Sequence, residues 1–253
     1  MTGAKTRLDR LVVAAGIAES RQRAQALIMA GKILVNGVPI DKPGTPVAPS
    51  DEILLRGQKM PYVSRGGLKL AAALEACRVA VEGAVCMDVG ASTGGFTDCL
   101  LQHGASHVYA VDVGYGQLAW KLREDSRVTV IERTNIRHMD PSAVPEPVDL
   151  ATIDTSFISL KIVVPSVLPF LRAGGTILAL IKPQFEVGKG KVGKGGVVRD
   201  AGLQAAVVES LSAFFEEIGL VRKSVVPSPV LGPKGNQEYV ILLDCPTPRS
   251  NST

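Results

Sequence analysis

The feature that most constrains the fold is a glycine-rich turn between an apolar run and a helical pattern. Residues 84–87 are apolar, Asp88 follows them, and the turn from Gly90 to Gly95 leads into a helical pattern over residues 96–102. A strand, a tight turn and a helix start form the kind of site that receives a nucleotide-like ligand at a helix N-terminus. The glycines taken alone are equally typical of a purely structural turn.

The residues of the turn favour S-adenosylmethionine over a dinucleotide. The dinucleotide fingerprint needs a second glycine so that the backbone can approach a pyrophosphate, and Ser92 stands at that position. Asp112 closes the next apolar run, roughly 20 residues further on, where a carboxylate typically binds ribose hydroxyls. We therefore predict a cofactor site formed by Asp88, Gly90, Ala91, Ser92, Thr93, Gly94, Gly95, Phe96, Asp112 and Asp154.

Composition places the chain among globular proteins that act without a membrane or a metal. Its 253 residues allow one or two domains, and 46% of them are hydrophobic, which is enough for a sizeable core. No apolar run reaches the ~18 residues of a membrane span. The four cysteines show no metal-ligand spacing and are expected to be buried small hydrophobes in a reducing compartment. We predict a cytoplasmic protein, monomeric, with no metal and no membrane partner.

Positive charge is concentrated in the first quarter of the chain. Through Lys69 there are 11 Lys and Arg residues against 5 Asp and Glu, whereas the remainder has 17 against 19. This asymmetry favours contact with a polyanion. The same quarter predicts two short helices, over residues 8–15 and from an N-cap at Ser20 through Ala30, followed by short strands at 33–35, 38–40 and 52–55 with a tight Asn36-Gly37 turn.

Basic side chains on these helices and on the turns after them are candidates for RNA contacts. The alternative is an ordinary solvated helix face. The predicted RNA-binding residues in and next to this module are Arg7, Arg10, Arg21, Arg23, Lys32, Lys42 and Arg65.

Three runs of this sequence resemble known families. The Arg7–Leu11 run, the Ser20–Ala24 run and the Ala30–Gly37 run resemble the S-four type RNA-binding domain. The second half resembles FtsJ-type methyltransferases. The combination, with Tyr62–Leu70, Gly90–Thr97 and Lys182–Glu186, resembles the TlyA family, often labelled haemolysin A, whose members are ribosomal-RNA cytidine-2′-O-methyltransferases. The resemblance implies an S-four-like domain over residues 1–59 and a methyltransferase domain over 65–245. The short segment 60–64 between them is predicted to be a linker, and the polar tail over 246–253 is expected to be frayed.

The second half also predicts its own architecture. Seven apolar runs separated by helical segments, at 85–89, 107–111, 128–131, 149–153, 175–181, 221–226 and 239–243, predict an α/β fold with a Rossmann-like, mainly parallel seven-stranded sheet. Ligands in such sheets bind outside the carboxyl ends of the strands, where Asp112, Asp154 and Lys182 fall. Glu238 precedes its strand, so it reaches that edge only if the strand runs antiparallel.

The family resemblance implies a catalytic tetrad of Lys69, Asp154, Lys182 and Glu238. A ribose 2′-hydroxyl is a poor nucleophile, and an amine can take its proton only when that amine is neutral. The resemblance makes Lys182 the base and gives Asp154 the task of orienting it. Simpler roles remain open for the other members: Lys69 can contact phosphate, Asp154 can cap the next helix, and Glu238 can be a strand-edge carboxylate.

A loop rich in glycine and lysine directly follows Lys182. Residues 186–196 contain five glycines and three lysines, a composition that cannot build a core. We interpret it as a lid over RNA phosphates, with Lys189 and Lys191 as contacts; the alternative is a surface loop without a role.

Together these features predict an S-adenosylmethionine-dependent 2′-O-methyltransferase that modifies cytidine in ribosomal RNA of the ribosomal subunits. Three other functions remain open: a nicotinamide dehydrogenase, which Ser92 and the small number of histidines (three) disfavour; a non-catalytic RNA-binding protein; and a pore-forming haemolysin. Bound S-adenosylmethionine would separate the second from the enzyme, and a liposome-leakage assay would test the third.

Overall fold

A computed structural model of the chain describes residues 5–48, 51–57, 60–188, 190, 192–193 and 195–246. The chain divides into two compact units. One comprises residues 1–60 with the short segments 193–197 and 231–236, and the other comprises residues 61–192, 198–230 and 237–253. Lys189 and Lys191, the residues next to the predicted boundary at 59 and the tail from 247 lie outside the described residues, so the predictions made for them, and the domain limits, stay predictions.

The N-terminal unit is a small α+β module. It contains helices α1 (Leu8–Ala14) and α2 (Arg21–Met29) and a three-stranded sheet in the order β3 (Val38–Ile40), β2 (Ile33–Val35), β5 (Ile53–Leu55). Ser20 is the N-cap of α2, and its hydroxyl accepts a hydrogen bond from the amide of Arg23 at 3.2 Å. The core of the module is apolar and fully enclosed; its buried members are Leu8, Val12, Ala18, Ala24, Ile28, Ile33 and Val47.

The second unit is built on one mixed sheet of seven strands in the order β11-β12-β10-β9-β6-β7-β8. The strands are β6 (Val85–Val89), β7 (His107–Val111), β8 (Val128–Ile131), β9 (Val148–Ile153), β10 (Leu171–Ile181), β11 (Val221–Pro227) and β12 (Tyr239–Asp244). β6 to β10 pair in parallel, whereas β12 is antiparallel to both of its neighbours. The predicted Rossmann-like fold class is therefore confirmed, including the antiparallel strand on which the placement of Glu238 depends.

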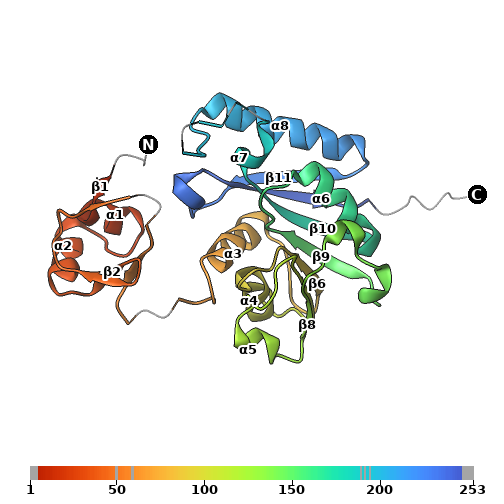
Figure 1. Cartoon of the computed structure of the whole chain (residues 1–253), viewed down its shortest axis with the longest axis horizontal. Coiled ribbons are helices and arrows are strands. Elements are labelled where there is room, and N and C mark those ends of the chain that lie inside the picture. Colours follow the sequence, from red (N-terminus) through yellow and green to blue (C-terminus); the bar gives the residue numbers. More distant parts are fainter. Residues whose placement is uncertain are drawn as a thin grey trace, which may run out of the picture. The chain divides into compact units, whose positions relative to one another are not determined.

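Helices cover both faces of this sheet (Figure 1). The helices of the unit are α3 (Gly66–Cys77), α4 (Gly95–Gln102), α5 (Trp120–Arg123), α6 (Leu160–Val167), α7 (Pro183–Glu186) and α8 (Ala201–Glu217). Successive residues of β6 enter different cores: Met87 and Val89 pack with α6 and α8, whereas Cys86 packs with α3 and α4. This alternation follows from the period of two along a strand, and burial on both faces explains why these strands are continuous apolar runs.

Two strand predictions were incomplete. β10 begins at Leu171 rather than at Gly175, and the register of its pairing with β9 shifts between Leu171 and Thr176. The two-residue strands β1 (Thr6–Arg7) and β4 (Pro46–Val47), which pair with each other, were not predicted. Their pairing depends on contacts between distant segments, which carry no local sequence signal.

In the described part of the chain, no helix has both the length and the apolar character needed to cross a membrane. The same residues contain no group of three or more His, Cys, Asp or Glu side chains arranged to hold a metal ion.

Candidate active site

The proposed base, Lys182, is held in an ion pair directly after β10. Its Nζ lies 2.5 Å from Oδ1 of Asp154, the residue that follows β9, and it donates a hydrogen bond of 3.0 Å to Oγ of Ser156. Only 8% of Lys182 is exposed. A lysine placed at a strand end and followed by Pro183, which starts α7, cannot swing freely into solvent. The structure therefore brings two of the predicted site residues into direct contact.

The other two predicted catalytic residues form a second buried pair. Nζ of Lys69, on α3, donates to Oε2 of Glu238 at 2.6 Å. Glu238 is fully buried and Lys69 is 9% exposed. The suggestion that Lys69 simply meets phosphate at the surface does not fit this burial, because its amine is committed to a carboxylate inside the protein.

Strand register places both pairs at the same edge of the sheet. Ile181 at the end of β10 is the partner of Tyr239 at the start of antiparallel β12, so Lys182 and Glu238 extend from neighbouring strands in the same direction. β9 runs parallel to β10, and Asp154 extends from it at that edge as well. This is the edge formed by the carboxyl ends of the parallel strands, where α/β proteins bind ligands.

The glycine-rich turn lies next to Asp154. Gly90 has a positive φ of 88°, and a β-carbon there would lie only 2.8 Å from the carbonyl oxygen of Asp154. A β-carbon at Gly94 would overlap the side chains of Leu118 and Leu122. Both glycines are thus required by contacts within the protein, a reason that spacing alone did not reveal. Of the predicted contact residues in this turn, Ser92 and Thr93 are exposed, whereas Ala91, Gly94, Gly95 and Phe96 are buried.

Asp112 holds the turn open towards the same edge. Its Oδ2 accepts a hydrogen bond from the amide of Ser92 at 2.7 Å, and its Oδ1 accepts one from the amide of Gly114 at 2.6 Å. The carboxylate is partly exposed, so it retains acceptor capacity for ribose hydroxyls. Val113 directly after it is 71% exposed and offers an apolar surface beside the carboxylate.

Asp88 supports the turn from beneath. It is completely buried, and its Oδ2 accepts hydrogen bonds from the amide and the hydroxyl of Thr97 at 2.9 and 2.7 Å, which ties β6 to the start of α4. Burial raises the pKa of the Asp88 carboxyl to about 7, and the nearby charge of Asp154 acts in the same direction. A direct contact between Asp88 and a cofactor, as the sequence suggested, stays a prediction.

Unpartnered buried polar atoms gather at this edge. Among the described residues, the buried side-chain atoms that lack a hydrogen-bond partner are Oδ1 of Asp154, which is ion-paired with Lys182, Oγ1 of Thr155, Oε1 of Gln184 and Oε1 of Glu238. Each belongs to the tetrad or to a residue within two positions of it. An unpaired buried polar atom costs about 1–3 kcal/mol, so a ligand that supplies partners here is favoured. A polar cofactor and a ribose fit this requirement.

Phe157 is a further candidate site residue, one that the sequence did not reveal. It has a positive φ of 64°, is 89% exposed and contacts the ring of Phe185 with centroids 4.8 Å apart. An exposed aromatic ring three residues after Asp154 is available for stacking on a base. The available signal was its position between Asp154 and the following helix, but composition alone does not distinguish such a residue from a core aromatic.

The segment before α3 is attached to the helix that starts at the glycine-rich turn. The amide of Val63 donates to Oδ2 of Asp98 at 2.8 Å, and Nε2 of Gln102 donates to the carbonyl of Pro61 at 2.8 Å. Both acceptor and donor side chains belong to α4. The predicted linker over 60–64 therefore has a fixed anchor on the catalytic unit.

In the N-terminal unit the predicted RNA-binding cations are on the surface. Arg7, Arg10, Arg21, Arg23, Lys32 and Lys42 are all exposed, and Arg65 at the start of α3 is partly buried. Buried Asp9 orients two of them, with 2.9 Å contacts to Nη2 of Arg7 and Nε of Arg21. The Arg7 guanidinium holds the pKa of Asp9 well below its ordinary value. Among the described residues, no carboxylate forms an ion pair with the side chain of Arg10, Arg23, Lys32 or Lys42.

The sheet order, the glycine-rich turn and the paired lysines at the carboxyl edge together define a Rossmann-like methyltransferase. Sequence comparison agrees, because the profile of FtsJ-like methyltransferases matches residues 62–245 and that of the S4 domain matches residues 6–53. The chain therefore belongs to the FtsJ-like methyltransferase family, in the group that contains TlyA, and the predicted resemblance is confirmed.

Relatives resemble almost the whole chain. The 16S/23S rRNA (cytidine-2′-O)-methyltransferase TlyA of Mycobacterium tuberculosis is 48% identical, with 98% of this chain and 93% of the relative covered. Hemolysin A of Brachyspira hyodysenteriae is 40% identical, with 92% and 98% covered. A solved structure from Streptococcus thermophilus, described as a hemolysin, has a TM-score of 0.76 at 42% identity and covers 98% of this chain and 92% of that one.

Proposed function

We propose that this protein transfers the methyl group of S-adenosylmethionine to the 2′-oxygen of a cytidine in ribosomal RNA. The observation that carries the proposal is the pair of buried ion pairs, Lys182–Asp154 and Lys69–Glu238, at the edge that also holds the glycine-rich turn and unpartnered polar atoms. The relatives named as rRNA cytidine-2′-O-methyltransferases, with coverage of nearly the full chain, support the substrate.

Residues of the glycine-rich turn and Asp112 would hold the cofactor. The exposed backbone and side chains of Ser92 and Thr93, the carboxylate of Asp112 and the apolar surface of Val113 match the methionine, ribose and adenine portions of such a molecule in polarity. S-adenosylmethionine, when bound, supplies an electrophilic methyl group. Everything else that the reaction needs is the removal of one proton and the alignment of one oxygen.

Lys182 performs the proton removal. Its Nζ is fixed by Asp154 and Ser156, so it can be aimed at a ribose hydroxyl that enters the edge of the sheet. An amine accepts a proton only in its neutral form, so the ammonium of Lys182 must first give up its own proton before it acts as the base. Lys69 on α3 and Glu238 beside β12 support the ribose, and Oε1 of Glu238, which has no hydrogen-bond partner among the described residues, is an acceptor for a sugar hydroxyl.

RNA recognition is divided between the two units. The exposed cations of the N-terminal unit bind phosphates and provide affinity without contacting the reacting atoms. Phe157 provides a ring face for the target base, which must leave its stack before its ribose can enter a protein site. A cytoplasmic location, where ribosomal subunits are found, and a monomeric state are part of this proposal.

The experiment that tests the function is methyl transfer to purified ribosomal subunits from labelled S-adenosylmethionine, followed by digestion to nucleosides. We expect label in 2′-O-methylcytidine. Label confined to bases, or its absence from both subunits, would contradict the proposal. A liposome-leakage assay with the same preparation tests the haemolysin alternative, for which the described residues offer no membrane-spanning helix.

A further inference from the structure

Contacts at the start, in the middle and at the end connect the two segments that carry the Lys182–Asp154 pair. One segment runs from Asp154 to Leu160 and the other from Lys182 to Glu186. The ion pair joins their first residues, and the rings of Phe157 and Phe185 meet in the middle. We call these two contacts, together with the hydrogen bonds of Glu186 described next, the clasp.

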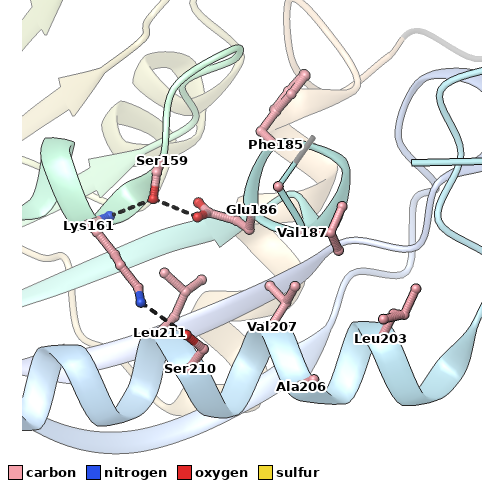
Figure 2. Close-up of a pocket in the computed structure, with 11 residues that line it drawn as sticks. Ser159, Lys161, Phe185, Glu186, Val187, Leu203, Ala206, Val207, Ser210 and Leu211 are labelled. Atoms are coloured by element: carbon pink, nitrogen blue, oxygen red, sulfur yellow. Dashed lines mark hydrogen bonds between the residues drawn. The ribbon is translucent and has the colours of Figure 1, made fainter. Parts of the chain in front are cut away.

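Glu186 closes the far end of the clasp with both of its carboxylate oxygens. Its Oε2 accepts a hydrogen bond of 2.6 Å from the hydroxyl of Ser159 (Figure 2). Its Oε1 accepts one of 2.8 Å from the amide of Leu160. These donors are at the first turn of α6, where a carboxylate is favoured by the helix dipole. Two charge-assisted bonds to one rigid helix end fix both the position and the rotation of α7.

The packing of α7 against its neighbours is incomplete on this side. A cavity of about 330 Å³ lies between α6, α7 and α8. Figure 2 shows Phe185, Glu186 and Val187 on one side of it and the side chains of α8 on the other. The lining residues from α8 are Leu203, Ala206, Val207, Ser210 and Leu211. A four-residue helix beside a hollow has few packing contacts on that side, so its position depends more strongly on polar contacts such as those of Glu186.

We propose that Glu186 is a positioning residue for Lys182. The carboxylate locks α7 onto α6, and α7 in turn holds Lys182 against Asp154; Glu186 itself touches neither substrate nor cofactor. The expected effect of Glu186 on turnover rests on the proposed function, whereas its expected effect on the position of the Lys182 amine does not depend on any reaction. Lys182 is the single residue between the end of β10 and the start of α7, so a shift of α7 moves the amine of Lys182 directly.

The first test measures the position of Lys182 without any reaction. Full-length protein is treated briefly with an amine-acetylating reagent, and the modification of each lysine is quantified by peptide mass spectrometry. Lys69 is the internal reference, because it is buried to the same degree but paired with Glu238 outside the clasp. We expect Glu186→Ala to raise the acetylation rate of Lys182 several-fold and to leave that of Lys69 unchanged.

The second test is kinetic. A displacement of about 1 Å in an active site costs roughly 10²-fold, so we expect Glu186→Ala to lower kcat by about 10- to 100-fold. KM for ribosomal subunits and the Kd of S-adenosylmethionine should stay within about twofold of the wild-type values. Glu186→Gln, which retains one acceptor oxygen, and Ser159→Ala, which removes one donor, should give intermediate losses. Glu217→Ala, at an exposed position of α8, is the matched control with wild-type kcat.

A double variant separates positioning from general loosening. Ser159→Ala combined with Glu186→Ala should be no slower than Glu186→Ala alone, because both changes remove the same link. The proposal is overturned if Glu186→Ala and Ser159→Ala leave the acetylation of Lys182 unchanged, or if Lys69 and Lys182 become reactive together. A wild-type protein that transfers no methyl group would refute the proposed function, whereas the acetylation result would still decide the role of Glu186.

Discussion

Removing the amine of Lys69 should destabilise the fold as well as stop the reaction. In Lys69→Met the apolar stem is kept, but the carboxylate of Glu238, completely buried and 2.6 Å from the lost amine, is left without a partner. Breaking a buried pair from one side typically costs about 3–5 kcal/mol. We expect about 3 kcal/mol, the low end of that range, because Glu238 can take up a proton instead of remaining charged.

Urea denaturation measures this cost as a lower midpoint with an unchanged slope. The matched variant is Lys69→Met with Glu238→Gln, which removes the charge of the second partner and should recover most of the lost stability. A Lys69→Met protein whose free energy of unfolding lies within about 0.5 kcal/mol of the wild-type value would refute the reasoning. In that case the pair would be solvated, and Lys69 would be available for phosphate contacts as the sequence had also allowed.

Four further predictions follow from the geometry. The buried Asp88 carboxyl has its pKa raised to about 7, so the wild-type free energy of unfolding should fall as pH rises from about 4 to about 7 and the carboxyl ionises. Asp88→Asn should make this fall smaller, which urea titrations across that pH range check. Asp112→Ala should weaken S-adenosylmethionine binding by about 1–3 kcal/mol in calorimetry, and unchanged affinity would remove Asp112 from the site. Phe157→Ala should slow methyl transfer to RNA with normal cofactor affinity, so that a loss of cofactor binding would contradict its stacking role. Replacing Arg10 and Arg23 with glutamine should weaken subunit binding and reduce its salt dependence by about two counterions in a filter-binding series; an unchanged slope would place the RNA elsewhere.

The strands of the catalytic unit were predictable because burial on both faces makes each of them a continuous apolar run. Asp112, Asp154 and Lys182 could be placed at one edge because they directly follow such runs. Glu238 required the topology, since its contribution depends on β12 running antiparallel. The start of β10 was missed because Gly174 and Gly175 interrupt its apolar pattern.

Contacts between side chains that are far apart along the chain could not be predicted from the sequence. Nothing local shows that Lys69 meets Glu238, 169 positions away, or that Glu186 reaches the start of α6. The glycines were predicted as part of a cofactor site, but the sequence did not show that atoms of the protein itself fill the space that a side chain at Gly90 or Gly94 would need. Such contacts arise only when the sheet brings distant segments together.

The most direct test of the central claim is the turnover of Lys182→Arg on ribosomal subunits, measured alongside its binding of S-adenosylmethionine and RNA. Arginine keeps the positive charge beside Asp154 but cannot accept a proton near neutral pH. A general base contributes about 10²–10⁴-fold, so we expect turnover reduced by at least about 10²-fold with both ligands bound normally. Near-wild-type turnover with normal binding would mean that Lys182 supplies only charge and that another group removes the 2′-proton.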